Sequence, residues 1–404
     1  MSKRTILFIG RFFPKKLYET ILKDSKGKIV FSNHNFEMSL LSGLEEQKDI
    51  KLTSISCPSV YTYPYHNNRI WTKSEEYENE NNHIKTTSFC NLPIINKLHQ
   101  VLSLSLLLLR YYRNHKDIEV IINTPSFFLM LGFFISKVFT KRIKSTTLII
   151  PDIPSMVTIL SSKQSIKTKI VGFLNRLSNL MMNKMDKYVL LTDAMKDFIK
   201  KDSVKYIVME GLIDIQRVNV IKREYIVKDK NVILYTGSLY KIFGIMNLIE
   251  AFIQANLDNT ELWICGSGEA ADEIKEIAKN RDDIVFYGLV DSKTALNLQQ
   301  QATILVNPRT SQGDYTKYSF PSKTIEYLLS GKVVVANRLP GIPNEYYEYI
   351  ITPKNETISE LSEVLKKIVF LSSEERAQIG IKGREFIIKN KNAKIQTRRI
   401  LDMN

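Results

Sequence analysis

Between Asn231 and Ala336 the chain alternates short apolar segments with segments of helical periodicity. Apolar runs of four or five residues that end at turn residues are typical of buried strands. Strands that alternate with helices in this way form a parallel sheet covered by helices on both faces. The pattern therefore predicts a doubly wound α/β domain. Its expected strands are residues 231–235, 261–265, 284–287, 303–307 and 333–336.

The first half of the chain shows the same alternation with less regular spacing. Its expected strands are residues 5–9, 51–57, 119–123, 147–150, 187–191 and 206–209. We therefore predict an α/β protein with two Rossmann-like, doubly wound domains that face each other across a cleft. The expected bounds are residues 1–209 for the first domain, 210–230 for a linker, 231–375 for the second domain and 376–404 for a C-terminal helix that returns to the first domain.

The composition argues against several other classes of protein. With 404 residues, of which 44% are hydrophobic and 25% charged, the chain is neither disordered nor collagen-like. The three cysteines are widely spaced without a CxxC pair, which argues against a disulfide framework or structural zinc and favours the cytoplasm. The apolar start before Arg11 is too short for a signal peptide. The runs Leu102–Leu109 and Phe127–Ile135 fall short of the ~20 residues that span a bilayer.

Positive charge is concentrated in the first half of the chain. Residues 1–200 carry 29 Lys/Arg and 16 Asp/Glu, a net charge of +13, whereas residues 201–404 carry 28 and 26, a net charge of +2. This asymmetry indicates an anionic partner for the first half, although a merely solvated basic surface is an alternative. Nucleic acid and an acidic membrane leaflet both fit the charge. We favour the membrane, because the first half contains no recognisable nucleic-acid-binding module.

Three turns of the second domain follow strands at one edge of the predicted sheet. They are residues 237–239, 266–269 and 307–322. Ligands of parallel sheets bind at this edge, next to the amino ends of helices. Glycines in the first two turns let backbone N–H groups approach a ligand. A single Gly-Ser-Gly turn is weak evidence, but three such turns on one edge indicate a binding site.

Residues 319–335 form the most specific motif. A helix is expected to start at residue 321, where Ser319 or Ser322 can cap it. The free N–H groups, the helix dipole and Lys323 suit a phosphate. Glu326 lies one turn further on the same face, where its carboxylate can accept both hydroxyls of a ribose. A plain helix-surface glutamate is the alternative, but the combination favours a nucleoside diphosphate.

These motifs together resemble the nucleotide-sugar domain of family-4-type glycosyltransferases with the GT-B fold. The matching pieces are Tyr235–Leu239, Gly244-Ile245, Leu248–Phe252, Trp263–Gly268, Val285–Gly288 and Phe320–Val335. The first half matches only in architecture and in the turn at Gly10. Within the family, the chain is most similar to enzymes that build bacterial capsule, O-antigen or exopolysaccharide repeat units on a polyprenyl diphosphate lipid.

The resemblance implies roles for particular residues. Glu326 matches the glutamate that holds the donor ribose, and residues 319–323 match the backbone that grips the diphosphate and sugar. Gly10 matches a loop that approaches the donor, and Asp152 lies near where family members contact the transferred sugar. The candidate catalytic residues are Asp152, Lys323 and Glu326. The candidate donor-binding residues are Gly10, Gly237, Ser238, Lys241, Gly266, Gly268, Arg309, Tyr318, Ser319, Phe320, Pro321, Ser322, Lys323 and Glu326.

The chain departs from the family at three positions. The first glutamate of the family's pair falls at Tyr318, and the usual diphosphate-binding arginine and lysine fall at Ser238 and Phe243. Nearby cations can substitute for the two that are lost, and we expect Lys323 and Arg309 to do so first. Lys241 and Lys317 are the other candidates.

The resemblance implies a retaining, metal-independent glycosyltransferase that moves a sugar from a nucleotide diphosphate sugar, with UDP as the expected nucleotide. Its acceptor is expected to be a hydroxyl of a lipid-linked or other glycan in bacterial surface polysaccharide synthesis. No Asp-x-Asp motif occurs, so we expect no metal site and no cofactor. The alternative is a catalytically silent GT-B subunit that binds glycan or a partner enzyme. A nucleotide-sugar epimerase is disfavoured, because no acidic pair is placed to abstract a proton from a sugar carbon.

The expected partners are a nucleotide sugar, a lipid-linked glycan acceptor and the anionic inner leaflet of the cell membrane, and not nucleic acid. We therefore expect a cytoplasmic protein that associates peripherally with this leaflet. The candidate membrane contacts are the helix at residues 96–113, the basic cluster at residues 137–144, and Lys163, Lys167 and Lys169. A helix with such a wide apolar face is most often simply buried against the sheet, which is the alternative for residues 96–113.

Overall fold

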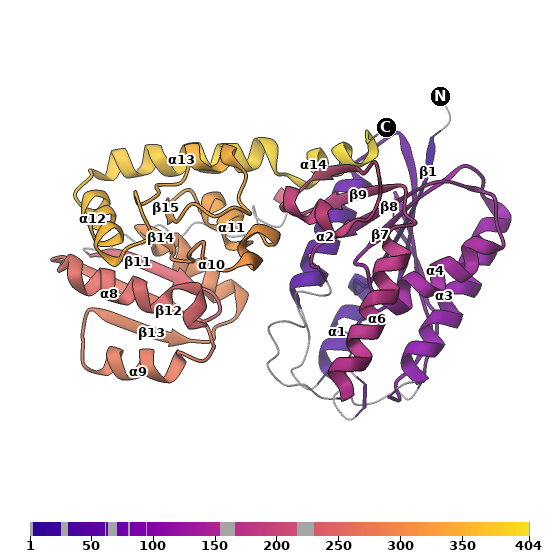
Figure 1. The fold of residues 1–404 in the computed structure, drawn as a ribbon, viewed down its shortest axis with the longest axis horizontal. Coiled ribbons are helices and arrows are strands. Elements are labelled where there is room, and N and C mark those ends of the chain that lie inside the picture. Colours follow the sequence, from indigo (N-terminus) through magenta and orange to yellow (C-terminus); the bar gives the residue numbers. More distant parts are fainter. Residues whose placement is uncertain are drawn as a thin grey trace. The chain divides into compact units, whose positions relative to one another are not determined.

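The computed structural model describes residues 3–25, 31–60, 62–63, 71–79, 81–93, 95–153, 166–215 and 230–403. The chain divides into two compact units, shown in Figure 1. The first unit contains residues 1–214 and 393–404, and the second contains residues 215–392. Each has a parallel sheet covered by helices, so the prediction of two Rossmann-like α/β domains is confirmed.

In the described part of the first unit, eight strands form one sheet in the order β10-β9-β8-β7-β1-β2-β5-β4. All neighbours pair in parallel except β4 and β5, which are antiparallel. A further short pair, β3-β6, lies outside this sheet. The strands are β1 (Arg4–Gly10), β2 (Ile50–Ser56), β3 (Trp71–Thr72), β4 (Glu76–Asn79), β5 (Asn82–Thr86), β6 (Phe89–Cys90), β7 (Ile118–Asn123), β8 (Ile143–Ile150), β9 (Lys187–Leu190) and β10 (Lys205–Val208).

The central strands β1 and β7 are buried nearly throughout, as their almost continuous aliphatic sequences require. Helices cover the sheet, and the C-terminal helix packs on α2, where Ile400 and Leu401 join Leu40 and Leu41 in one core. The helices of this unit are α1 (Lys15–Asp24), α2 (Phe31–Glu45), α3 (Ile95–Asn114), α4 (Phe127–Val138), α6 (Ile166–Met182), the 3-10 helix η1 (Asp193–Phe198) and α14 (Ala393–Leu401).

The second unit has a five-stranded parallel sheet in the order β13-β12-β11-β14-β15, which confirms the five predicted strands. Strand order reverses beside β11, and such a switch point is where ligands bind in open α/β sheets. The strands are β11 (Asn231–Thr236), β12 (Thr260–Cys265), β13 (Ile284–Gly288), β14 (Ile304–Asn307) and β15 (Val333–Ala336). The α-helices are α8 (Ile245–Ala255), α9 (Ala271–Lys279), α10 (Ser292–Gln301), α11 (Lys323–Ser330), α12 (Ile358–Val369) and α13 (Ser373–Asn390), and the 3-10 helices are η2 (Lys241–Phe243), η3 (Asp314–Tyr318) and η4 (Asn344–Glu348).

The C-terminal segment differs from the prediction of one returning helix over residues 376–404. It is two helices separated at residues 391–392: α13 packs on α11 and β15 in the second unit, and only α14 packs in the first. Gly380 and Gly383 explain why α13 stays with the second unit, because a Cβ at Gly380 would lie 2.0 Å from the carbonyl oxygen of Gly331. Most of the predicted linker, residues 216–229, lies outside the described residues.

Two local features differ from what the sequence predicts. Residues 58–82 are rich in Tyr, Asn and Glu without periodicity, which predicts a surface loop, but the segment contributes β3 and β4, which pair with β6 and β5. Residues 33–35 are candidates to cap a helix that begins near Glu37, but they lie inside α2, whose described part begins at Phe31. The imidazole of His34 stacks on Tyr18, lies tilted against Phe13 and accepts the Phe13 N–H at Nδ1 (3.2 Å).

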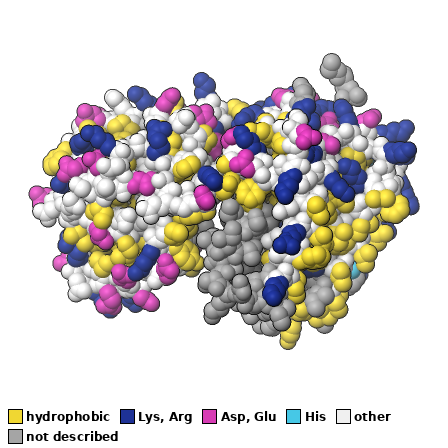
Figure 2. Space-filling model, viewed as in Figure 1, with side chains coloured by type: hydrophobic (Ala, Val, Ile, Leu, Met, Phe, Trp, Pro, Cys, Tyr) yellow, Lys and Arg dark blue, Asp and Glu magenta, His cyan; other side chains and the backbone are white. Residues whose placement is uncertain are grey.

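The outer face of α3, α4 and α6 is apolar and lacks acidic residues. α4 packs against both other helices, and none of the three contains Asp or Glu, although together they contain seven Lys/Arg. Figure 2 shows hydrophobic side chains gathered over this part of the first unit. The exposed apolar side chains are Ile95, Leu98, Leu102 and Leu106 on α3, Ile135 and Val138 on α4, and Ile170, Val171, Phe173 and Leu180 on α6. No helix among the described residues is long and apolar enough to cross a membrane.

Candidate donor site

A buried network at the carboxyl end of β11 forms the base of the site in the second unit. The Tyr327 hydroxyl of α11 accepts the Thr236 N–H (2.8 Å) and donates to the Thr236 carbonyl oxygen (3.1 Å). Burial raises the pKa of Tyr327, so its phenol stays protonated. Gln299 of α10, 1% exposed, donates to Thr236 Oγ1 (3.2 Å) and to Glu326 Oε1. α10 and α11 are thereby tied to the strand end, and the carboxylate of Glu326 has a fixed position.

Glu326 also forms an ion pair within its own helix. Its Oε1 accepts from Lys323 Nζ at 2.8 Å, and the two side chains are 33% and 35% exposed. Within the described residues, Oε2 of Glu326 has no hydrogen-bond partner. One carboxylate oxygen is therefore fixed by the protein and the other is free for a ligand hydroxyl, next to a cation.

The amino end of α11 has no side-chain cap. The residue before the helix, Ser322, makes no capping hydrogen bond, and Ser319 accepts instead from Arg309 Nη2 (2.9 Å). The prediction that one of these serines caps the helix is therefore wrong. The first N–H groups of the helix have no side-chain acceptor, and they carry the positive end of its dipole. These donors and Lys323 suit a negatively charged group.

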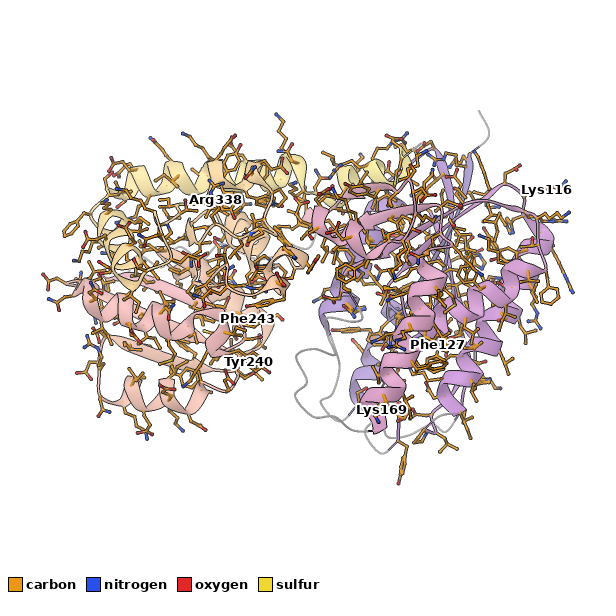
Figure 3. The ribbon with its side chains drawn as sticks, in the orientation of Figure 1. Lys116, Phe127, Lys169, Tyr240, Phe243 and Arg338 are labelled. Carbon is orange, nitrogen blue, oxygen red and sulfur yellow. The ribbon has the colours of Figure 1, made fainter. Side chains whose placement is uncertain are left out.

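Arg309, just beyond β14, has its guanidinium positioned by two aromatic rings. The guanidinium carbon lies 4.7 Å from the ring centre of Tyr315 and 5.1 Å from that of Phe243, which Figure 3 labels. The side-chain amide of Asn337 holds the backbone of Arg309 in place by donating to its carbonyl oxygen (3.0 Å). A cation thus lies over Phe243, the position at which the family resemblance places the lost lysine. This placement fits the expectation that Arg309 substitutes for that lysine.

The other two candidate cations have acidic partners on the surface. Lys241 pairs with Glu273 (2.7 Å), and Lys317 pairs with Asp314 (3.3 Å). Lys317 also lies over the ring of Tyr318, 5.0 Å from its centre. Lys323 is also paired, with Glu326, so Arg309 is the candidate cation that has no acidic partner among the described residues, whereas Lys323 differs from Lys241 and Lys317 in lying at the uncapped amino end of α11.

The glycine turns of the second unit pack against each other. A Cβ at Gly266, where φ is +149°, would lie 1.8 Å from the Gly237 carbonyl oxygen, and one at Gly268 would lie 2.5 Å from the backbone of Leu239. The N–H groups of Gly237 and Gly266 donate to Cys265 and Gly288. These glycines are therefore required for turn-to-turn contact, and those two N–H groups are not free for a ligand. Ser238 is exposed at the tip of its turn.

The remaining members of the motif have different environments. The ring of Phe320 is buried and packs on Tyr346, with ring centres 5.4 Å apart, so it anchors the loop from inside. The Pro321 carbonyl oxygen accepts from Thr324 N–H at 2.8 Å and starts the helix. Phe320 and Pro321 thus shape the loop that presents the amino end of α11.

In the first unit, Gly10 is the last residue of β1, and Asp152 follows β8. A Cβ at Gly10 would lie 2.6 Å from Oε2 of Glu37, which accepts the Arg11 N–H (2.6 Å) while Oε1 accepts from Asn123 Nδ2 (2.7 Å). Burial raises the pKa of Glu37 to about 7. Asp152 is exposed beyond its strand. The structure thus adds Glu37, absent from the predicted site, as the group that shapes the Gly10 turn.

Residues 230–369 match the family model of glycosyl transferases group 1. This span includes all five strands of the second unit and the network around Glu326. The protein is a glycosyltransferase. Over 297 residues it is 26% identical to an uncharacterized glycosyltransferase of Methanocaldococcus jannaschii, a match that covers 69% of this chain and 72% of the relative.

Solved structures agree on the fold of the glycosyltransferase. A glycosyltransferase from Rickettsia africae has a TM-score of 0.62 at 14% identity and is matched over 100% of this chain and 98% of its own. HepE from Anabaena, solved in complex with UDP, has a TM-score of 0.59 at 14% identity, with 98% of each chain covered. Likeness at these identities shows the shared α/β fold with two Rossmann-like domains.

The sequence does not reveal the buried residues that support the site of the glycosyltransferase through hydrogen bonds to the end of β11. The sequence predicts only that Gln299 and Tyr327 lie in helices, yet both donate hydrogen bonds to Thr236. A polar side chain on the inner face of an amphipathic helix was the available signal, because buried polar groups need partners. The partners themselves come from three elements that are distant in sequence.

Proposed function

We propose that this glycosyltransferase takes a sugar from a nucleoside diphosphate sugar, with UDP as the favoured nucleotide, and transfers it with retention of configuration. The acceptor is a hydroxyl of a lipid-linked or other glycan in bacterial surface polysaccharide synthesis. The observation that carries the proposal is Glu326, fixed on Oε1 and free on Oε2, one helical turn beyond an uncapped helix end.

In this proposal each part of the donor has its own contact. Glu326 accepts the ribose hydroxyls, and the amino end of α11 with Lys323 receives the diphosphate. Arg309, fixed between two rings, supplies a second cation. Preorganised donors of this kind stabilise charge that develops on a leaving diphosphate without a bound metal.

The transfer breaks the bond between the anomeric carbon and the diphosphate oxygen and forms a bond from that carbon to the acceptor oxygen. The leaving diphosphate takes the acceptor's proton, so no separate protein base is required. Retention and this proton transfer are carried over from the family resemblance. The lipid-linked acceptor is supported by the family resemblance and by the basic, apolar face of the first unit.

Calorimetric titration with UDP, GDP, ADP and CMP tests the donor site. We expect wild type to bind one nucleotide and Glu326→Ala to bind it roughly 100-fold more weakly or not at all, because two charge-assisted hydrogen bonds are lost. Glu363→Ala is the matched control, since Glu363 forms a similar exposed ion pair with Lys366 on α12 (3.0 Å). Absence of binding by wild type would contradict the proposal. Nucleotide binding without hydrolysis of any nucleotide sugar would favour the silent-subunit alternative.

In this proposal, the exposed apolar face of α3, α4 and α6 binds the membrane that carries the acceptor. Four leucine or isoleucine side chains along α3 are 50 to 61% exposed, in a face that lacks carboxylates. Aromatic and basic residues at the end of the predicted contact helix would suit the headgroup level, but its Tyr111 and Tyr112 are buried. Lys169, labelled on α6 in Figure 3, and the cations at residues 141, 142 and 144 are exposed around this part of the unit. Apolar contact flanked by basic residues suits an anionic leaflet. Of the other candidate contacts, Lys163 lies outside the described residues.

Co-sedimentation with phosphatidylglycerol vesicles at low salt tests this surface. Leu102→Glu combined with Leu106→Glu is expected to weaken vesicle binding by more than roughly tenfold, since two apolar contacts become two repelled charges. Leu289→Glu, at a side chain that is 79% exposed in the second unit, is the control. Equal binding by the double variant and the control would contradict the proposed surface.

A further inference from the structure

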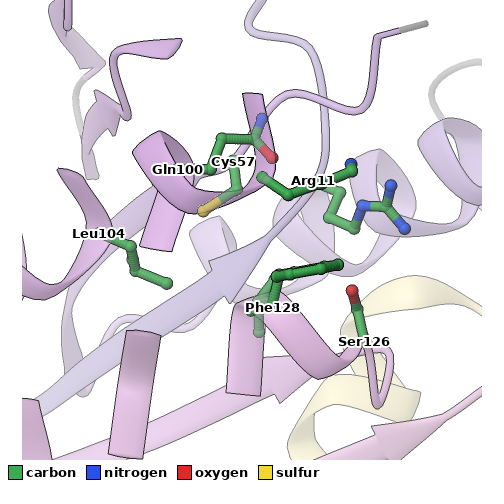
Figure 4. A pocket seen from close by; sticks show the side chains of 8 residues that line it. Arg11, Cys57, Gln100, Leu104, Ser126 and Phe128 are labelled. Atoms are coloured by element: carbon green, nitrogen blue, oxygen red, sulfur yellow. The ribbon is translucent and has the colours of Figure 1, made fainter. Parts of the chain in front are cut away.

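A pocket in the first unit gathers two cations at the carboxyl edge of the sheet. Arg11 follows β1, Cys57 follows β2, and Lys97 and Gln100 come from α3. The apolar side chain of Leu104, also on α3, and the start of α4 complete the lining. Figure 4 shows these groups around one hollow. The described residues that line it are Arg11, Cys57, Lys97, Gln100, Leu104, Ser126, Phe128 and Leu129.

Neither cation has an acidic partner among the described residues. Arg11 donates to the Ser59 hydroxyl, which leaves other guanidinium N–H groups available, and Lys97 forms no ion pair. Burial and the charge of Arg11 lower the pKa of Lys97 to about 8. The buried Glu37 carboxyl accepts the Arg11 backbone N–H and the Asn123 amide, and the Arg11 charge acts on it only through space. Among the described residues, the pocket therefore holds two cations that no carboxylate contacts directly.

The start of α4 adds hydrogen-bond donors to the same pocket. Ser126 precedes the helix and makes no capping hydrogen bond, and the first turn contains no acidic residue. The first intrahelical bond runs from Met130 N–H to the Ser126 carbonyl oxygen (2.9 Å). The N–H groups of Phe127, Phe128 and Leu129 therefore have no partner within the helix. Two of these three residues line the pocket.

We propose that this pocket is an anion subsite that binds a phosphoryl group, with Arg11 and Lys97 as its charged ligands and the amino end of α4 as its backbone donors. The remaining wall, made by Leu104, Phe128 and Leu129, is apolar, so a hydrocarbon chain attached to a bound phosphoryl group would have apolar side chains to contact beside the subsite. Only this assignment to the acceptor lipid rests on the proposed function. The anion subsite itself does not depend on it.

Calorimetry with inorganic diphosphate tests the subsite directly. Lys97→Gln and Arg11→Gln are each expected to weaken one binding event by roughly 10- to 100-fold, because a charge-assisted contact is lost. Lys200→Gln, at an exposed lysine of the same unit, is the matched control. Lys323→Gln separates the two units: it is expected to leave this event intact even if it abolishes binding in the second unit. Unchanged affinity in Lys97→Gln and Arg11→Gln would overturn the subsite, as would loss of all binding in Lys323→Gln.

Proton uptake gives a second readout that a merely structural role would not change. At pH 8 a bound anion should protonate the remaining neutral fraction of Lys97, so the binding heat should vary with the ionisation enthalpy of the buffer. This dependence should disappear in Lys97→Gln and persist in Lys200→Gln. A binding heat of wild type that is independent of buffer would contradict contact between Lys97 and the anion.

Farnesyl diphosphate and inorganic phosphate distinguish the sources of the phosphoryl group. A dissociation constant for farnesyl diphosphate roughly tenfold or more below that of inorganic diphosphate would assign the subsite to a lipid acceptor. Equal constants would assign it to a free anion and overturn the acceptor assignment while supporting the subsite. Failure of the nucleotide titrations would leave both outcomes unaffected, because no nucleotide is present.

Discussion

The carboxyl edges of the two sheets differ in whether their charged side chains are paired. In the second unit Lys323 lies against Glu326 at 2.8 Å, so the cation and the carboxylate compensate each other before any ligand arrives. In the first unit the charges are separated: Glu37 is buried with only neutral donors on its oxygens, and Lys97 and Arg11 have no carboxylate partner among the described residues. The first edge therefore carries an electrostatic cost that a ligand or a proton can relieve, whereas at the second edge the Lys323–Glu326 pair is already compensated and Arg309 is the cation without an acidic partner among the described residues.

The pKa values of the two edges express this difference. Burial raises the pKa of Glu37 to about 7, and burial with the neighbouring Arg11 charge lowers the pKa of Lys97 to about 8. Both groups consequently titrate close to physiological pH. Ligand binding and stability in the first unit should therefore depend on pH between about 6 and 9.

The largest expected effect compares the glycines at the two edges. In Gly266→Ala the new Cβ would meet the Gly237 carbonyl oxygen at 1.8 Å, so the backbone itself must move. In Gly10→Ala it would meet the side chains of Glu37 and Phe8 at 2.6 and 2.8 Å, which can shift. We expect Gly266→Ala to lower the free energy of unfolding of its unit by about 3 kcal/mol or more, and Gly10→Ala to cost about 1–2 kcal/mol.

Urea unfolding measures this difference in the two units separately. The chain has two tryptophans, and Trp263 of β12 is buried close to Gly266, so a Trp71→Phe background reports the second unit by fluorescence. Hydrogen exchange of the β1 amides reports the first unit. Equal losses for the two variants would show that the Gly266 turn yields as easily as the Gly10 turn.

The second-largest expected effect is that Glu37→Gln changes how the stability of the first unit depends on pH. The folded pKa of Glu37 lies above its ordinary value of 4.5, so the folded state binds the proton more tightly and its stability falls as pH rises through 7. From pH 5 to pH 8 this loss is about 2–3 kcal/mol for wild type. Glu37→Gln should remove most of it, because the amide carries no charge. Asn123 can rotate its amide to accept from the new side chain, since its Oδ1 is buried without a partner among the described residues.

Hydrogen exchange of β1 and β7 amides at several pH values tests this expectation. Glu46→Gln, at an exposed carboxylate just beyond α2, is the control and should retain the wild-type slope. If wild type and Glu37→Gln lost stability equally between pH 5 and pH 8, the source of the slope would lie elsewhere.

The predictability of the two sites from sequence also differs. The elements of the second unit can be predicted from the sequence because its strands, turns and the helix at Lys323 follow one another along one stretch of chain, and each strand length matches its apolar run. The pocket at Arg11 cannot be predicted from the sequence, because its lining residues come from four separate segments and no spacing in the sequence links Arg11 to Lys97. The missing caps at Ser322 and Ser126 could not be predicted either. A serine at the right position does not reveal whether its hydroxyl faces the helix.

The smallest effect isolates a positioning residue of the second unit. Gln299 donates to both Glu326 and Thr236, and Gln299→Leu removes both donors while keeping a buried side chain of similar size. Glu326 would then be free to turn toward Lys323. We expect UDP to bind roughly tenfold more weakly, whereas inorganic diphosphate binds as before, since only the ribose contact depends on the orientation of the carboxylate. Calorimetry with the two ligands separates these cases. Because α11 and its cations remain in place, an equal loss for both ligands would mean that Gln299 supports the whole turn rather than Glu326 alone.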